Sequence, residues 1–205
     1  MKPAPAHWTI VILGRWNVSI FNPDWLGKNL FDNKELFVEV PMEPGLPMRF
    51  TGDNVLLIPH SDRVILGAKE TTNDNLTHME KLATKLVDIL PHTPIGAVGV
   101  NFGYDVRPIP EKIREAFRNP HAKEFTEHEL TVPSKSFKWS CKYHGETVNM
   151  SFDFDNDKLL VKSNFHSDAH TAAQVIDALK GKVLSKREFT ETILKDIYEL
   201  ELEDI

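Results

Sequence analysis

The stretch SDRVILGAKETTNDNLTHMEKLATKLVDIL, residues 61–90, carries the pattern that decides the fold. It opens with turn residues, continues as a β-branched apolar run over 63–67, and then places apolar residues every three or four positions. This change of period predicts a strand that leads into an amphipathic helix over 75–90, and Thr77 and Glu80 have the spacing of a capping box. The apolar stripe of this helix is predicted to consist of Leu76, Met79, Leu82, Ala83, Leu86, Val87 and Leu90.

The residues before this stretch predict more strands and one short helix. Residues 8–16 form a β-branched apolar run, and Pro23 stands where the first position of a helix would be. That short helix is predicted to bury Leu26, Leu30 and Phe31. Further apolar runs separated by turn residues predict an antiparallel meander, at 36–40, 48–51, 54–59 and 63–67.

The same order begins again after the long helix. A strand over 95–104 is followed by a short helix that Pro110 opens, with Ile113 and Phe117 on its inner face. Then come predicted strands and a helix, at 125–132, 136–144, 147–155, 158–165 and 169–179. The repeated order predicts an internal duplication, with a first repeat over 1–93 and a second over 94–183.

A third segment, 184–205, is predicted to be an amphipathic C-terminal helix with an acidic end. Ser185 and Glu188 have capping-box spacing. Its predicted apolar stripe consists of Phe189, Ile193, Ile197 and Leu200.

Composition narrows the classes of function. The chain has 205 residues and a formal net charge of −6, which opposes the electrostatic attraction that supplies most non-specific nucleic-acid affinity. Cys141 is the only cysteine, so an intrachain disulfide and a cysteine-rich zinc site are excluded. Without a recognisable signal peptide or a long apolar run, we expect a cytoplasmic protein that is not embedded in a membrane.

The predicted order of elements resembles the TATA-binding-protein fold: a strand, a short helix, a meander and a long helix. The stretch SDRVILGAK at 61–69 adds a local resemblance to the same family. The resemblance covers about residues 8–181. It implies an α+β fold, in which a duplicated β-α-(antiparallel β meander)-α unit forms one curved antiparallel sheet with helices on one face, plus the C-terminal helix.

The resemblance also implies where DNA-reading residues would stand. The family carries an asparagine on the first strand of each repeat, and the matching places here hold Thr9 and a residue near Ala97. The kinking phenylalanines of the family match Pro59 in one repeat and Phe152 or Phe154 in the other. These departures lead us to expect that duplex DNA is not a partner.

Two neighbouring strands predict an open polar face. Residues 136–144 and 147–155 alternate between apolar and polar side chains, so their polar sets share the face that the helices leave uncovered. The candidate binding residues of this region are Lys138, Lys142, His144, Asn149 and Lys162. The strands at 10–13 and 55–58 are apolar on both faces, so a homodimer contact, the C-terminal helix or a partner protein should cover the second face.

The predicted function is therefore a non-catalytic binding protein that engages a protein partner, or a second copy of itself, through the exposed sheet face and the acidic C-terminal helix. An inhibitor or antitoxin that masks a basic surface would be one form of it. The alternatives are a nucleic-acid-binding module that uses Lys138, Lys142 and Lys162, and an enzyme with a site among His92, His144 and the acidic hairpin.

No cofactor or metal is expected. His166 and His170 have the spacing of two ligands on a helical turn, but they straddle a predicted strand end and helix start, which favours surface histidines. Asp153, Asp155 and Asp157 lack the glycine and the closing glutamate of a calcium loop. Cys141 is predicted to be a buried, unreactive thiol on the apolar face of its strand.

Overall fold

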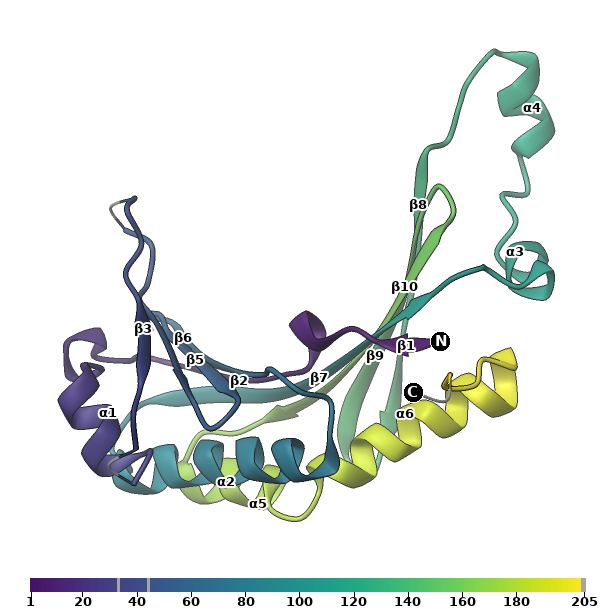
Figure 1. The fold of residues 1–205 in the computed structure, drawn as a ribbon. Helices are drawn as coiled ribbons and strands as arrows, with labels where there is room; N and C mark the ends of the chain where they lie inside the picture. Colours follow the sequence, from purple (N-terminus) through teal and green to yellow (C-terminus); the bar gives the residue numbers. More distant parts are fainter. Residues whose placement is uncertain (33, 44, 204–205) are drawn as a thin grey trace.

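A computed structural model describes residues 1–32, 34–43 and 45–203. It contains a 10-stranded antiparallel sheet that curves like a saddle, with helices packed along it (Figure 1). The predicted α+β class and the curved antiparallel sheet are confirmed. No helix of the described residues is long and apolar enough to cross a membrane.

The strands follow the order β3-β4-β5-β6-β2-β7-β10-β9-β8, and β1 pairs with β7 beside this path. Their bounds are β1 (Lys2–Pro3), β2 (Thr9–Gly14), β3 (Phe37–Glu39), β4 (Arg49–Gly52), β5 (Val55–Pro59), β6 (Arg63–Ala68), β7 (Ile95–Val106), β8 (Ser134–Tyr143), β9 (Glu146–Asp155) and β10 (Lys158–Asp168). The helices are α1 (Pro23–Asn29), α2 (Asn73–Ile89), α3 (Glu111–Ala116), α4 (Ala122–Glu127), α5 (Ala172–Leu179) and α6 (Val183–Tyr198), with short 3-10 turns η1 (Pro5–His7) and η2 (Val18–Ile20).

Strands β2 and β7 form the middle of the sheet. They pair antiparallel, with Thr9 opposite Asn101 and Ile12 opposite Val98. Successive side chains of a strand point to opposite faces, so Ile10 and Ile12 are buried beneath the sheet while Thr9 lies on the concave side.

The convex side of the sheet carries α2, α5 and α6 (Figure 1). Helix α2 packs on β2, β5 and β6, whereas α5 and α6 pack on β7. The predicted stripe of α2 is buried from Leu76 to Val87, and only Leu90 at its end is half-buried. Ile176 of α5 is also half-buried against the core.

Neither predicted capping box forms, because α2 begins after Thr72 and α6 begins after Lys182. Helix α2 begins after Thr72, whose Oγ1 accepts the Asn75 N–H at 3.2 Å. The Glu80 carboxylate is used elsewhere, because it accepts the N–H groups of Gly181 at 2.7 Å and Val183 at 3.1 Å. Glu80 therefore satisfies unpaired N–H groups of Gly181 and Val183 at the start of α6, which are 101 and 103 residues further along the chain.

The face that helix α6 turns to the sheet matches the predicted stripe only in part. The buried residues of the helix are Val183, Lys186, Thr190 and Leu194. Of the predicted stripe, Leu200 just after the helix is buried, and Phe189 and Ile193 are half-buried against the core. Ile197 of the predicted stripe is 61% exposed. The apolar pattern was misleading because polar groups of the sheet receive Lys186 and Thr190, so this helix does not need a purely apolar face. Residues 204 and 205 of the predicted helix lie outside the described residues.

The strand expected over 125–132 is wrong. The chain forms α4 there and continues to β8 without a strand. Alanine, lysine and glutamate at 122–124 favour a helix, and Phe125 N–H donates to the His121 carbonyl at 3.0 Å. Strand β8 is therefore the outermost strand on its side of the sheet.

The prediction of a buried Cys141 is also wrong, because its side chain is exposed. It lies on the same face of β8 as Trp139 and Tyr143, which are themselves only half-buried. An outermost strand lacks a neighbour on one side, so packing covers its convex side chains only in part.

Candidate functional site

A row of polar side chains crosses five adjacent strands on the concave face. Sheet register places these side chains directly opposite one another, from β8 through β9, β10 and β7 to β2. They are Ser140, Asn149, Asn164, Asn101 and Thr9; we call them the amide row.

Hydrogen bonds connect the amide row from end to end. Ser140 Oγ donates to Asn149 Oδ1 at 2.6 Å, and Asn149 Nδ2 donates to Asn164 Oδ1 at 3.0 Å. Asn164 Nδ2 then donates to Asn101 Oδ1 at 2.8 Å, and Asn101 Nδ2 donates to Thr9 Oγ1 at 3.0 Å. A side-chain amide has two N–H donors and two acceptor lone pairs, so each asparagine keeps capacity for a ligand on the open side.

A second row lies beside it. Lys138 stands opposite Ser151, which stands opposite Lys162. Lys162 Nζ lies 2.7 Å from Asp153 Oδ2. Burial acts to raise the pKa of Asp153, but hydrogen bonds from Lys162 and from nearby serines outweigh it and lower the pKa below its ordinary value. Lys162 is thus compensated, whereas Lys138 has no acidic partner among the described residues.

The N-terminal segment closes one side of this area. Turn η1 crosses β7 at Gly103, where a Cβ atom would lie 2.4 Å from the His7 Cβ. Only glycine allows this close approach. Trp8 Nε1 donates to the Gly103 carbonyl at 2.8 Å and anchors the crossing. The two rows, Ala6 and His7 line a cavity of about 460 Å³.

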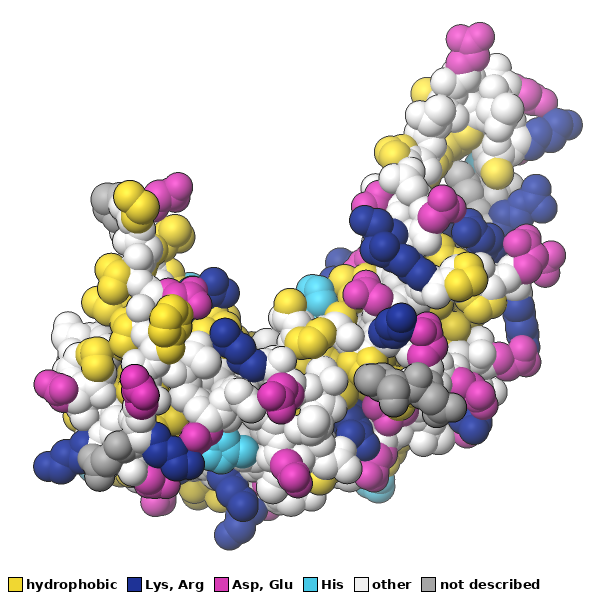
Figure 2. Space-filling model, in the orientation of Figure 1, with side chains coloured by type: hydrophobic (Ala, Val, Ile, Leu, Met, Phe, Trp, Pro, Cys, Tyr) yellow, Lys and Arg dark blue, Asp and Glu magenta, His cyan; other side chains and the backbone are white. Residues whose placement is uncertain are grey.

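Beside the two rows, the concave face has an apolar area on β2, β5 and β6. Val11 and Leu13 of β2 share it with Leu56, Ile58 and Ile65 of the neighbouring strands. Leu13 is 41% exposed. Figure 2 shows the hollow between two raised ends, with hydrophobic side chains gathered at the end that carries β3. The C-terminal helix does not cover this surface, because α6 lies on the convex side (Figure 1).

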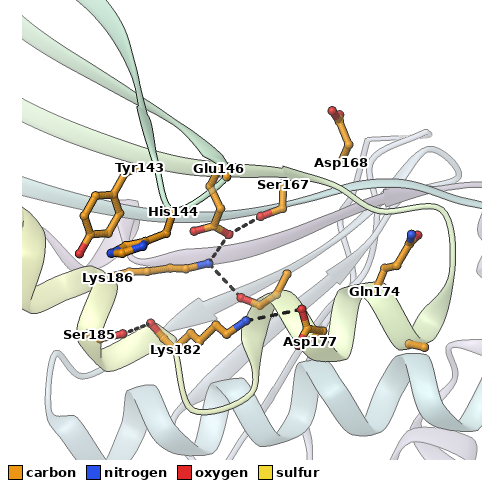
Figure 3. A pocket seen from close by; sticks show the side chains of 13 residues that line it. Tyr143, His144, Glu146, Ser167, Asp168, Gln174, Asp177, Lys182, Ser185 and Lys186 are labelled. Atoms are coloured by element: carbon orange, nitrogen blue, oxygen red, sulfur yellow. Dashed lines mark hydrogen bonds and ion pairs between the residues drawn. The ribbon is translucent and has the colours of Figure 1, made fainter.

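A second cavity, of about 780 Å³, lies between the β8–β9 turn, α5 and α6 (Figure 3). Lys186 Nζ lies 2.7 Å from Glu146 Oε1 and 2.9 Å from the Ala178 carbonyl oxygen. Ser167 Oγ donates to the same Glu146 oxygen. Burial lowers the pKa of Lys186, and the ion pair with Glu146 acts against this shift.

The polar groups of Glu146, Ser167 and Lys186 in this second cavity are hydrogen-bonded to one another or to the backbone. The Glu146 carboxylate already accepts hydrogen bonds from the Lys186 ammonium group and the Ser167 hydroxyl. Lys186 in turn satisfies a helix carbonyl. These contacts tie α6 and α5 to the sheet, and we assign them a structural role.

The structure separates the predicted binding residues. Lys138, Asn149 and Lys162 line the concave cavity together. Lys142 lies on the same face one row further along, where its Nζ donates to Thr147 Oγ1 at 2.7 Å. His144 lies in the β8–β9 turn and lines the second cavity instead.

The groups suggested for an enzyme do not converge. His92 lines neither of the two cavities, and Asp153 and Asp155 stand at the opposite end of β9 from His144. Across residues 1–32, 34–43 and 45–203, no group of three or more His, Cys, Asp or Glu residues could hold a metal ion. His166 Nε2 lies 3.3 Å from Asp168 Oδ1.

Sequence reasoning missed Asn101, Asn164 and His7. Sheet register puts Asn101 opposite Thr9 and Asn164 opposite Asn101, and the sequence pattern does not give these pairings. The available signal was an asparagine between two glycines, Gly99 and Gly103, on one face of a largely apolar strand. In comparison with known proteins, no family model and no curated protein matches this chain, so the assignment of function rests on the geometry described above.

Proposed function

We propose that this protein is a non-catalytic binding protein that engages a protein partner through the concave face of its sheet. The observation that carries the proposal is the composition of that face. An exposed apolar surface and the amide row adjoin on one continuous sheet, and the formal charges nearly cancel.

The apolar part supplies an attractive contact area. It extends from β2 to the raised end at β3, where Phe37 is 64% exposed and Met42 is fully exposed. Contiguous exposed apolar surface of this kind marks interaction sites in soluble proteins. Its burial would contribute about 25 cal/mol per Å² of apolar area removed from water.

The amide row offers directional hydrogen bonds from uncharged groups. Its free N–H and C=O groups match the donors and acceptors of a partner's backbone and polar side chains. Interfaces combine such groups with an apolar centre and place few charges there. A partner seated across β2 and β7 would contact both kinds of surface.

Charge supports a protein rather than a nucleic acid. By strand alternation the concave face of β2 to β10 carries six basic and five acidic side chains, a formal excess of one positive charge. These are Arg49, Arg63, Lys138, Lys142, Lys158 and Lys162 against Glu39, Asp105, Asp153, Asp155 and Asp168. A protein that neutralises about six phosphates would need a far larger local excess.

The acidic C-terminal end contributes less to the proposal than the sheet. Glu199, Glu201 and Glu203 pair with lysines of this chain. The Met1 amino group also donates to the Glu201 carbonyl at 2.6 Å. These internal partners support the concave face as the main contact surface and weigh against a role in masking a basic protein.

We also infer a TATA-binding-protein-like saddle that arose by duplication. The order β2-β6-β5-β4-β3 runs outward from one side of the central pair, and β7-β10-β9-β8 runs outward from the other. Helix α3 follows β7 as α1 follows β2, and α4 stands in the chain where the counterpart of β3 would be. Matching strand orders on both sides support the duplication.

Site-specific photo-crosslinking tests the proposed function. A benzophenone amino acid replaces Leu13 on the concave face or, as a control, Lys81 on the exposed side of α2. We expect a discrete crosslinked protein from position 13 and none from position 81. A product of twice the chain mass identifies a second copy as the partner. No product from position 13, or equal products from both positions, contradicts the proposal.

A nucleic-acid-binding module remains the second candidate, because Lys138 and Lys162 lie in one cavity with the amide row. Fluorescence anisotropy with mixed and A·T-rich duplexes and with single strands, at about 150 mM salt, separates the two. We expect no submicromolar binding of duplex DNA. Submicromolar affinity that falls steeply as salt rises would favour the second candidate.

A further inference from the structure

A third cavity, of about 380 Å³, lies between α3, α4 and the first residues of β8. The segment 125–132, for which the sequence predicted a strand, forms part of its wall. One part of its wall is basic and consists of Arg114, Arg118 and Lys135. Another part is apolar and includes Phe125, Leu130 and Val132.

The electrostatics of this cavity are one-sided. Its lining contains three cationic side chains and no aspartate or glutamate, in a chain whose net charge is −6. Arg114 lies 3.4 Å from Asp157, whose side chain is 95% exposed. Among the ion pairs of the described residues, Arg118 and Lys135 have none.

Lys135 is held in place although no counter-ion compensates it. Its Nζ donates to the Phe117 carbonyl at 2.6 Å and lies 4.8 Å from the centre of the Phe154 ring. Burial lowers the pKa of Lys135, and the nearby charge of Arg114 lowers it further. A partly buried charge without a counter-ion is costly, so an anion beside Lys135 would stabilise this arrangement.

The apolar part of the wall is open to solvent. Leu130 is 56% exposed and Val132 is 45% exposed, on a segment that the core of the sheet does not cover. Cavities that bind small molecules combine apolar walls with a few polar groups, at volumes of about 300 to 1,000 Å³. The third cavity has both features.

We propose that the third cavity binds a small amphipathic carboxylate, with the carboxylate at Arg118 and Lys135 and the hydrocarbon chain along Phe125, Leu130 and Val132. A guanidinium group matches the two oxygens of a carboxylate. The proposal is independent of the proposed function, because this cavity shares no lining residue with the concave one.

Isothermal titration calorimetry with the full chain tests it, using sodium octanoate as the probe. Octanol lacks the charge, acetate lacks the hydrocarbon chain, and octylammonium carries the opposite charge. The variant Arg118→Gln removes an exposed cation of the cavity, and Lys123→Gln on α4 removes an exposed cation outside its lining. Both substitutions are on the surface, and circular dichroism verifies that the variants fold.

We expect octanoate to bind at least about tenfold more tightly than octanol, acetate or octylammonium, which corresponds to one charge-assisted contact. Arg118→Gln should weaken octanoate about tenfold and Lys123→Gln should leave it unchanged. Equal affinity for octanoate and octanol would overturn the proposal, as would absence of octanoate binding or an equal effect of the two substitutions.

Discussion

The two halves of the sheet, one packed against α2 and the other against α6, are stabilised by different means. We call them the α2 side and the α6 side. Where α2 covers β2, β5 and β6, the interface is almost entirely hydrocarbon, with Leu66 and Leu86 fully buried. Where α6 covers the other strands, polar pairs lie at the interface as well, and one of them is fully buried. Ser163 and Thr190 share a hydrogen bond at 3.0 Å, and Tyr104 donates to Glu191 at 3.1 Å.

The concave face shows the same contrast. The strands on the α2 side present Val11, Leu13 and Ile58 there, while the amide row begins at Thr9 of β2 and continues across the strands on the α6 side. Burial of hydrocarbon suffices for one region, and the other adds satisfied polar contacts. Substitutions should therefore act through cavities on the α2 side, and through lost partners and pH on the α6 side.

The largest effect is expected at the buried ion pair of the α6 side. Lys186→Ala leaves the Glu146 carboxylate without its ammonium partner and should cost about 3 to 5 kcal/mol of unfolding free energy in urea titrations. As a control, Lys182→Ala removes a lysine whose pair with Asp177 is exposed, and should cost less than about 1 kcal/mol. Equal costs would show that the buried pair is not special.

The second largest loss of stability is expected from a substitution that leaves an empty space in the core under α2. Leu86→Ala removes a fully buried side chain from the predicted stripe, and we expect a loss of about 2 to 5 kcal/mol in the same titrations. Lys81→Ala on the exposed face of α2 should change stability by less than about 0.5 kcal/mol. If Leu86→Ala were also nearly neutral, hydrocarbon burial would not hold this region.

The amide row should show a smaller loss. Asn164→Ala removes the central member, which donates to Asn101 and accepts from Asn149, and should cost about 1 kcal/mol because water can replace part of these contacts. A double-mutant cycle with Asn101→Ala measures their coupling. Strictly additive losses would show that the row is not an energetic unit.

The smallest effect is a change in the pH dependence of stability. Burial raises the pKa of Glu191 above its ordinary 4.5, although Arg187 and the Tyr104 hydrogen bond act against the shift. The folded state therefore binds this proton more tightly than the unfolded state, and stability falls as the pH rises through the window just above 4.5. Glu191→Gln should remove that slope in urea titrations between about pH 4 and 7.

Its control is Asp196→Asn, an exposed position on the same helix. The prediction is contradicted if the difference in unfolding free energy between the wild-type protein and Glu191→Gln stays constant across this pH range.

Most of the elements could be predicted because their signals are local. The stripe from Leu76 to Val87 and the alternation over 136–144 depend only on the period of helix and strand. The helix α4 was missed because Phe125, Leu130 and Val132 look like strand residues unless their exposure is known. The buried face of α6 was missed because a buried Lys186 makes sense only with Glu146 beneath it.

The sequence by itself determined the α+β class, the meander with its long helix, and three of the residues that line the concave cavity. These features depend on periodicity and on turn residues, which can be recognised from residues close together in the chain. Only the tertiary structure decided which asparagine faces Thr9, where Glu80 is used, and which cations surround the third cavity. Those outcomes depend on strand register and on contacts between residues up to about 100 positions apart, and local patterns carry no information about either.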